Sequence, residues 1–202
     1  MPNLAIYDFD HTLTTKDSFF VFLGFLCGKV KSLSALLYVI SIYPLQSKEL
    51  KNKIGFKSFV KTKLIDLLVT GRTVEDCTNA AIKARQVQVI KNDVFDTLID
   101  HLDKGNSIVI ASGALSLYLP ELVRDIPNDG IICTNISTEN GIVTGKMTNG
   151  NCVRFRKKEL IQEWIETQEK KGIFFDEIYA YGNPPDDDHM MELAHHKTLI
   201  TK

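Results

Sequence analysis

The chain has 202 residues, of which 44% are hydrophobic and 24% are charged, and its formal net charge is −1. This composition is typical of a folded globular protein, and the near-zero charge gives no overall attraction to nucleic acid, so we expect no nucleic-acid partner. The four cysteines lie far apart, without a Cys-x-x-Cys pair, and the N-terminus lacks a signal-peptide pattern. Both features predict reduced thiols in a cytoplasmic protein.

Strand-like and helical patterns alternate along the chain. In chain order they predict a strand at 3–9, helices through most of 17–104, a strand at 107–113, a strand and a hairpin at 131–147, a helix at 156–171, and strands at 177–183 and 197–201. Such alternation predicts a parallel α/β sheet with helices on both faces. The first helical block is too long for one crossover. We therefore assign residues 15–90 to a helical cap subdomain, and residues 1–14 and 91–202 to the α/β core domain.

Residues 19–45 are unusually apolar, but Lys29 and Lys31 divide them into two runs. Each run is shorter than the roughly 18–20 residues that a membrane span needs. We therefore predict two helices packed as a hairpin. Whether the cap also contacts a membrane surface is left open at this stage.

Polar residues that can perform chemistry follow three of the predicted strands. They are Asp8 and Asp10 in "DFDHT", Ser112 in "ASGA", and the acids of "GNPPDDD"; a basic helix start near Lys157 is a fourth element. In open parallel sheets, ligands bind at the carboxyl ends of the strands. A nucleophilic carboxylate, a second carboxylate as acid and base, and a lysine and a hydroxyl that hold phosphoryl oxygens would together suit phosphoryl transfer.

These four motifs, in this order, resemble those of the haloacid dehalogenase (HAD) superfamily phosphatases. The insert after the first motif is similar to the cap of the phosphoserine-phosphatase-like branch, subfamily IB. The resemblance implies a three-layer Rossmann-like core with a helical C1-type cap. It also implies Mg²⁺ as cofactor, hydrolysis of a phosphomonoester through an aspartyl phosphate, and a small phosphorylated substrate such as phosphoserine or an amino-alcohol phosphate.

The same resemblance assigns roles to individual residues. Asp8 is expected to be the nucleophile and a metal ligand, and Asp10 the general acid and base that also offers its backbone carbonyl to the metal. Thr12, Ser112 and Gly113 are expected to bind phosphate. Asp17 is expected to face the substrate, although capping of the next helix explains it equally well.

Two further assignments carry alternatives. Lys157 and Lys158 compete for the lysine role, and because adjacent helical residues point about 100° apart, only one can face the site. The family's usual spacing from Cys152 favours Lys157. In the fourth motif, Asp187 is preferred to Asp186 as the second acid, and the resemblance implies that Asp187 and Asn183 are metal ligands together with Asp8 and Asp10.

Asn183 stands where the family usually has a metal-binding Asp. An amide oxygen can coordinate Mg²⁺ but brings no charge. We therefore predict weaker metal binding at this site. A catalytically weak phosphate-binding protein is the corresponding alternative function.

The cap decides the substrate in this family, and its first half is rich in Phe, Leu and Ile while residues 48–63 hold six lysines. A helical bundle that buries its own apolar face is the preferred interpretation. The alternative is contact with an anionic membrane, at the inner membrane face. Because the cap also resembles that of C-type phosphatidylglycerophosphatases, the corresponding alternative function is a peripheral lipid-phosphate phosphatase.

Overall fold

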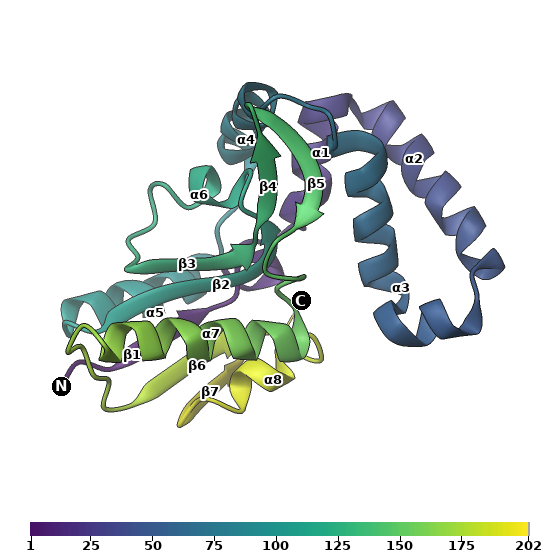
Figure 1. Cartoon of the computed structure of the whole chain (residues 1–202). Helices are drawn as coiled ribbons and strands as arrows, with labels where there is room; N and C mark the ends of the chain where they lie inside the picture. Colours follow the sequence, from purple (N-terminus) through teal and green to yellow (C-terminus); the bar gives the residue numbers. More distant parts are fainter. Residues whose placement is uncertain (202) are drawn as a thin grey trace.

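The computed structural model describes residues 1–201, with the side chains of residues 50–54 excepted. Its main sheet has five parallel strands in the order β3-β2-β1-β6-β7 (Figure 1). These are β1 (Leu4–Tyr7), β2 (Ser107–Leu115), β3 (Gly130–Thr134), β6 (Ile178–Gly182) and β7 (His196–Leu199). In the register, Tyr7 lies between Ile110 and Tyr181. The predicted parallel α/β fold is confirmed.

Helices cover both faces of this sheet. They are α5 (Asn92–Asp103) and α6 (Leu119–Leu122) on one side, and α7 (Arg154–Glu169) and α8 (Asp188–Met191) on the other. Alternate side chains of β1 divide between the two layers, with Ala5 and Tyr7 packing toward α5, and Leu4 and Ile6 toward α7 and α8. A strand buried on both faces has apolar residues at successive positions, which is why it could be found in the sequence.

The chain between β1 and α5 is almost entirely helical. It consists of η1 (Phe9–Leu13), α1 (Ser18–Cys27), α2 (Lys29–Ile42), η2 (Tyr43–Leu45), α3 (Lys48–Leu64), η3 (Ile65–Val69) and α4 (Val74–Val87). Figure 1 shows α2 and α3 to one side of the sheet. The predicted helical content of this segment is thus observed, and the division of the chain into core and cap stays a prediction.

A two-stranded antiparallel sheet, β4 (Ile136–Glu139) and β5 (Ile142–Met147), lies against this helical segment. The turn between its strands is Asn140-Gly141, with φ angles of 50° and 77°. Two positive φ angles are what a tight hairpin turn needs, so the Asn-Gly pair predicted this hairpin correctly. The Gly71 amide donates to the carbonyl of Val143 at 2.8 Å and so joins the hairpin to the cap.

The apolar helices α1 and α2 form a bent pair, as predicted. In the part of the chain that the structure describes, no single helix is long and apolar enough to cross a membrane. The two helices together with η2 meet that test, but with a 120° bend between them. Phe22 and Leu23 of α1 are buried, whereas Leu37 and Tyr38 of α2 are exposed. The expectation that the cap buries its apolar face is therefore right for one side of α1, where Phe20 and Phe25 remain exposed, and wrong for the outer side of α2.

Candidate active site

Asp8 lies directly after β1, at the carboxyl edge of the sheet. Its amide donates to the carbonyl of Tyr181 in β6 at 2.9 Å, which fixes the backbone, and its side chain is buried. The next residues turn back sharply, because His11 adopts a left-handed conformation with φ 63° and ψ 0°. This turn brings the Thr12 hydroxyl to within 2.9 Å of Asp8 Oδ2, to which it donates a hydrogen bond. A non-glycine residue in this conformation is uncommon outside sites where geometry matters.

Lys157 reaches this carboxylate from the first turn of α7. Its Nζ lies 2.8 Å from Asp8 Oδ1 and 2.6 Å from Asp187 Oδ1, and all three side chains are buried. Lys158 instead points to the surface and pairs with Glu192 at 2.7 Å. The rotation of α7 thus places Lys157, and not Lys158, beside Asp8.

Asp187 is held from two sides. Its Oδ1 accepts from Lys157, and its Oδ2 accepts from the backbone amide of Asn183 at 2.9 Å. A Cβ atom on Gly182 would lie 2.8 Å from Asp187 Oδ2, so only glycine permits this approach. The rival residue, Asp186, lies outside the network and forms ion pairs with Lys57 and Arg154, at 2.5 Å and 3.5 Å.

Ser112 and Gly113 belong to β2 at the same edge of the sheet. Tyr7 pairs with Ile110 in the parallel register, so the residues that follow each of them lie next to one another. Ser112 is buried, and its Oγ accepts from the amide of Ala114 at 3.1 Å. The Gly113 carbonyl accepts from the hydroxyl of Thr134 at 2.9 Å.

Asp10, in η1, and Asp17, directly before α1, both contact the start of α1. Asp10 Oδ1 accepts from the amide of Ser18 at 2.8 Å, and Asp17 Oδ1 accepts from the amides of Phe19 and Phe20 at 3.0 and 3.4 Å. Asp17 therefore caps this helix, which was one of its two interpretations. Its contact with a substrate stays a prediction.

Lys61 is a functional candidate that the sequence analysis did not single out. It extends from α3 to the sheet edge, where its Nζ contacts the carbonyl of Gly113, the hydroxyl of Thr134 at 3.2 Å and Asn151 Oδ1 at 2.5 Å. Lys57, four residues earlier on the same face of α3, forms its ion pair with Asp186 of the α/β core domain. This spacing was the available signal, but six lysines in residues 48–63 obscured it.

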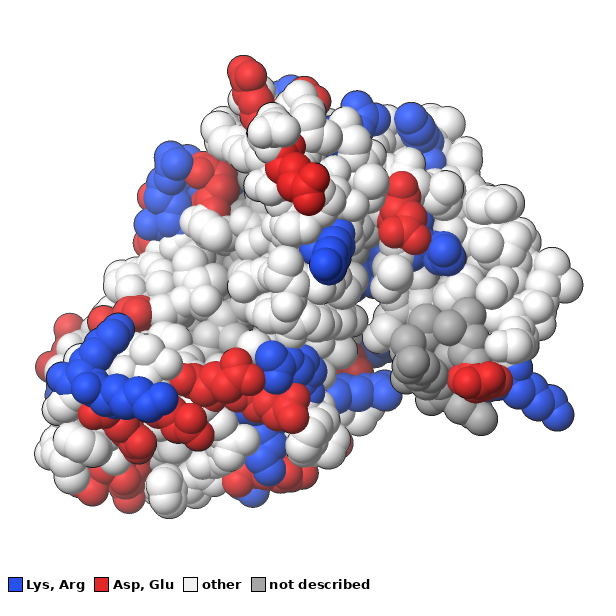
Figure 2. All heavy atoms as spheres, in the orientation of Figure 1, with Lys and Arg blue, Asp and Glu red and all other residues white. Residues whose placement is uncertain are grey.

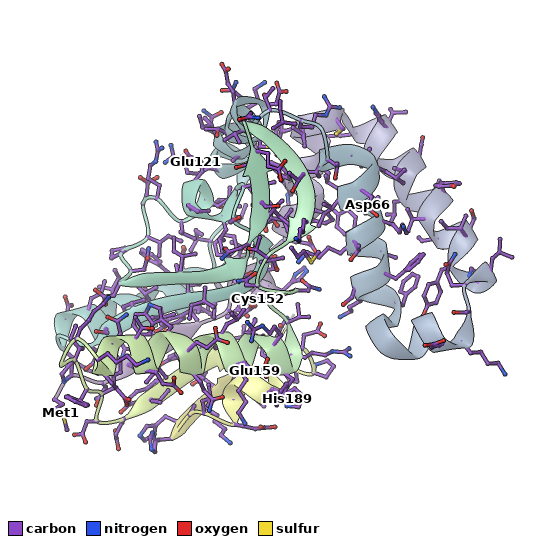
Figure 3. All side chains as sticks on the ribbon, viewed as in Figure 1. Met1, Asp66, Glu121, Cys152, Glu159 and His189 are labelled. Atoms are coloured by element: carbon purple, nitrogen blue, oxygen red, sulfur yellow. The ribbon has the colours of Figure 1, made fainter. Side chains whose placement is uncertain are left out.

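Cys152 marks the position of the site in the fold. Figure 3 shows it where the carboxyl edge of the sheet, the β4–β5 hairpin and the start of α7 meet. Its amide donates to the hydroxyl of Thr134 at 3.0 Å, and burial raises the pKa of its thiol to about 11. A thiol with a raised pKa stays protonated at neutral pH, so we assign it a packing role.

Burial dominates the electrostatics of the acids. It raises the pKa of Asp8 to about 6, although the charge of Lys157 opposes the shift, and it raises the pKa of Asp10 to about 7, with the neighbouring Asp17 adding to the effect. Burial acts to lower the pKa of Lys157, but Asp8 and Asp187 raise it overall. The buried carboxylates around Lys157 thus carry more negative charge than this one lysine can neutralise.

The acidic excess bears on the cation that the family implies. In the chain as far as it is described, no group of three or more Asp, Glu, His or Cys side chains could hold a metal ion. The oxygens expected to hold the cation are those of the Asp8 and Asp187 carboxylates, the Asp10 carbonyl and the Asn183 side chain, and both carboxylates already accept hydrogen bonds. Oxygen donors are the ligand type that Mg²⁺ prefers, so these residues fit the ion. Asn183, however, adds no negative charge to the site.

Comparisons with known proteins give a consistent result. A family model described as haloacid dehalogenase-like hydrolase matches residues 5–192. The curated protein CicA from Caulobacter vibrioides is 26% identical over 200 residues, which cover 97% of this chain and 85% of CicA.

Two solved structures share the fold. A protein of unknown function from Bordetella pertussis Tohama I superposes with a TM-score of 0.80 at 16% identity, over 98% of this chain and 90% of that one. A phosphoserine phosphatase, solved as a phospho-aspartyl intermediate analogue, superposes with a TM-score of 0.65 at 16% identity, over 98% and 86%. The predicted fold family is thus confirmed.

Proposed function

Since the chain belongs to the haloacid dehalogenase-like hydrolase family, we propose that it is a phosphatase that hydrolyses phosphomonoesters with Asp8 as nucleophile. The observation that carries this proposal is the buried network in which Lys157 bridges Asp8 and Asp187 at the carboxyl edge of the sheet. A structural ion pair needs one acid and one base. A lysine shared between two buried carboxylates, beside a strained turn, is typical of a site built for chemistry.

In the first step, an oxygen of Asp8 attacks phosphorus, and the bond from phosphorus to the leaving oxygen breaks. The pKa of Asp10 is raised to about 7, so a large fraction of its carboxyl is protonated near neutral pH and can donate a proton to the leaving alcohol. Lys157 and the Ser112 hydroxyl supply positive charge and a hydrogen bond to the phosphoryl oxygens. The products of this step are the free alcohol and an aspartyl phosphate.

In the second step, water attacks the phosphorus of the aspartyl phosphate while Asp10, now deprotonated, accepts a proton from it. The phosphorus bond to Asp8 breaks, which releases inorganic phosphate and restores both carboxyl groups. Thr12 and Lys157 hold the Asp8 side chain in one orientation throughout, because each donates to a different oxygen of it.

We assign Mg²⁺ as the cofactor, with the Asp8 and Asp187 carboxylates, the Asp10 carbonyl and the Asn183 side chain as the protein ligands that would hold it. When bound, the ion would supply positive charge beside the phosphoryl group. Asn183 contributes an oxygen without charge, so weak metal binding, and with it slow turnover, is part of the proposal.

For the substrate we propose a small phosphomonoester of an amino acid or an amino alcohol. Asp17 at the start of α1 would face a cationic amine. Lys61, whose Nζ lies beside the Gly113 carbonyl and Asn151 Oδ1, would face a carboxylate, as in phosphoserine. A structural neighbour that is a phosphoserine phosphatase supports the choice.

A lipid-borne phosphate is the second candidate substrate, and the observation that favours it is the exposed apolar side of α2. Because the headgroup phosphate is itself a monoester, the chemistry at Asp8 would be the same.

The test is phosphate release from amino-acid, sugar and lipid phosphates and from a generic aryl phosphate, with and without Mg²⁺. Asp8→Asn is the blank, and Lys158→Met is the control for surface changes. We expect Mg²⁺-stimulated release that Asp8→Asn abolishes, and a phosphoryl mass addition on the peptide that contains Asp8 after acid quenching. Equal turnover by Asp8→Asn would disprove the assignment of the nucleophile.

A further inference from the structure

The outer side of α2 is apolar from its first turn through η2. Its exposed apolar side chains are Val30 (82%), Leu33 (57%), Leu37 (59%), Tyr38 (56%) and Leu45 (82%). Residues three, four, seven or eight positions apart share one side of a helix, so these side chains form a continuous stripe in which Ser34 and Ser41 are the interleaved polar residues. The opposite side, with Ser32 and Val39, is buried. A stripe of this length is unusual for a surface that faces water alone.

The charged side chains that flank the stripe in the sequence are mainly basic, and Glu49, next to Lys48, is the first carboxylate after it. The sequence has no carboxylate side chain between Asp17 and Glu49, whereas Lys29 and Lys31 stand at the start of α2 and Lys48 follows η2, all three exposed. Figure 2 shows that the surface over α2 is largely free of charged side chains on the face in view. An apolar stripe with cations at both ends complements a surface that is negative outside and apolar beneath.

The position of α2 suits such a contact. Figure 1 shows α2 at the outer edge of the molecule, with α3 between it and the sheet. The inward contacts of the cap come from α1, α3 and α4, for example Lys61 with Gly113 and Arg85 with Glu121. Docking through α2 therefore leaves the contacts at the active site in place.

We propose that α2 docks on an anionic membrane surface and lies in the interfacial plane, with its apolar stripe among the acyl chains and its flanking lysines at the headgroups. Tyr38 has an apolar ring and a polar tip, which is the amphipathic character that membrane interfaces favour. A second copy of the chain would also cover the stripe. However, Lys29 and Lys31 lie in the first turn of α2, so two such helices packed in parallel would bring like charges together. The proposal holds whether the substrate is soluble or a lipid.

The test is co-sedimentation of the full chain with vesicles of phosphatidylcholine and phosphatidylglycerol, and with vesicles of phosphatidylcholine alone. We expect binding to the anionic vesicles that added salt weakens. The double variant Leu33→Ser/Leu37→Ser should bind at least about tenfold more weakly, because two exposed leucines no longer enter the bilayer. Lys29→Ala/Lys31→Ala should lose binding to the anionic vesicles severalfold.

Matched controls separate this surface from general effects. Leu199→Ser removes an equally exposed leucine (60%) from β7, and Lys170→Ala/Lys171→Ala removes two exposed lysines at the end of α7. Both controls should bind as the wild type does. Hydrolysis of a soluble aryl phosphate should be unchanged in every variant, so a failure of docking and a failure of the proposed phosphatase activity give different results.

A second measurement does not depend on the double variant folding. Leu37→Trp should show a blue shift of tryptophan emission on anionic vesicles, beyond any change of Trp164 in the wild type. The proposal is overturned by any of three results: no binding to anionic vesicles, equal binding of the wild type and the leucine double variant, or dimerisation of the wild type in solution through α2 without vesicle binding.

Discussion

Replacing Lys157 with methionine tests whether the buried network is as demanding as its geometry indicates. The lysine lies 2.8 Å from Asp8 and 2.6 Å from Asp187, and each of the three side chains is less than one-tenth exposed. Removing it leaves two buried carboxylates without this cation, and breaking a buried ion pair in this way costs about 3–5 kcal/mol. In a chain of this size, a loss of about 1 kcal/mol in the free energy of unfolding lowers the melting temperature by about 2–4 °C. We therefore expect the melting temperature of Lys157→Met to fall by about 6–20 °C.

The assay is thermal and urea unfolding in the presence of a chelator, so that bound metal does not contribute to stability. Lys158→Met is the matched control, because its ion pair with Glu192 lies at the surface and such pairs contribute at most about 1 kcal/mol. Adding Asp187→Asn to Lys157→Met should recover part of the loss, since one of the two stranded charges is removed. The reasoning fails if Lys157→Met is as stable as Lys158→Met. It also fails if Asp187→Asn destabilises the Lys157→Met variant as much as it destabilises the wild type.

Three further predictions follow from the same site. Gly182→Ala should displace Asp187 and lower kcat at least about tenfold; unchanged kcat would contradict the close approach of the two residues. Asn183→Asp should lower the Mg²⁺ concentration that gives half-maximal activity, and an identical metal titration would show that the missing charge is unimportant. Burial lowers the pKa of Lys61 from 10.5 to about 8, so between these pH values the unfolded chain binds more protons at this position. The wild type should therefore gain stability relative to Lys61→Met as pH rises from 8 to 10.5, whereas a constant difference would contradict the shift.

The strands and the catalytic motifs were predictable because each has a local cause. A parallel strand buried on both faces is apolar at successive positions, and "SIVIASG" identified β2 although the strand continues to Leu115. Acids that follow a strand stand out because Asp is disfavoured within strands. The choice of Lys157 over Lys158 came from the family's usual spacing to Cys152, in agreement with its contact with Asp8, and not from the pattern of the helix itself. Which lysine faces the site depends on the rotation of α7 against the sheet, which packing decides and one pair of adjacent lysines does not reveal.

Which sides of the cap helices are buried was harder to predict, because tertiary packing decides that as well. Apolar residues occur on more than one side of α1 and α2, and the sequence does not say which side another element covers. The structure covers one side of α2 and exposes the other, with Val39 buried and Leu37 exposed. Lys61 was missed because its contacts with Gly113 and Asn151 join positions far apart in the chain.

The contacts that hold the cap over the site differ greatly in strength. The ion pair of Lys57 with Asp186 lies at the surface, with the lysine side chain 68% exposed, and pairs of this kind stabilise little. Lys61 is partly buried and contacts three oxygens of the core, so losing it would remove three hydrogen bonds at once. Two backbone bonds, from the Gly71 amide to the Val143 carbonyl and from the Val143 amide to the Arg72 carbonyl, join cap and hairpin independently of any side chain. The position of α3 over the sheet edge therefore depends on Lys61 and the hairpin, and removing Lys57 alone should leave it unchanged.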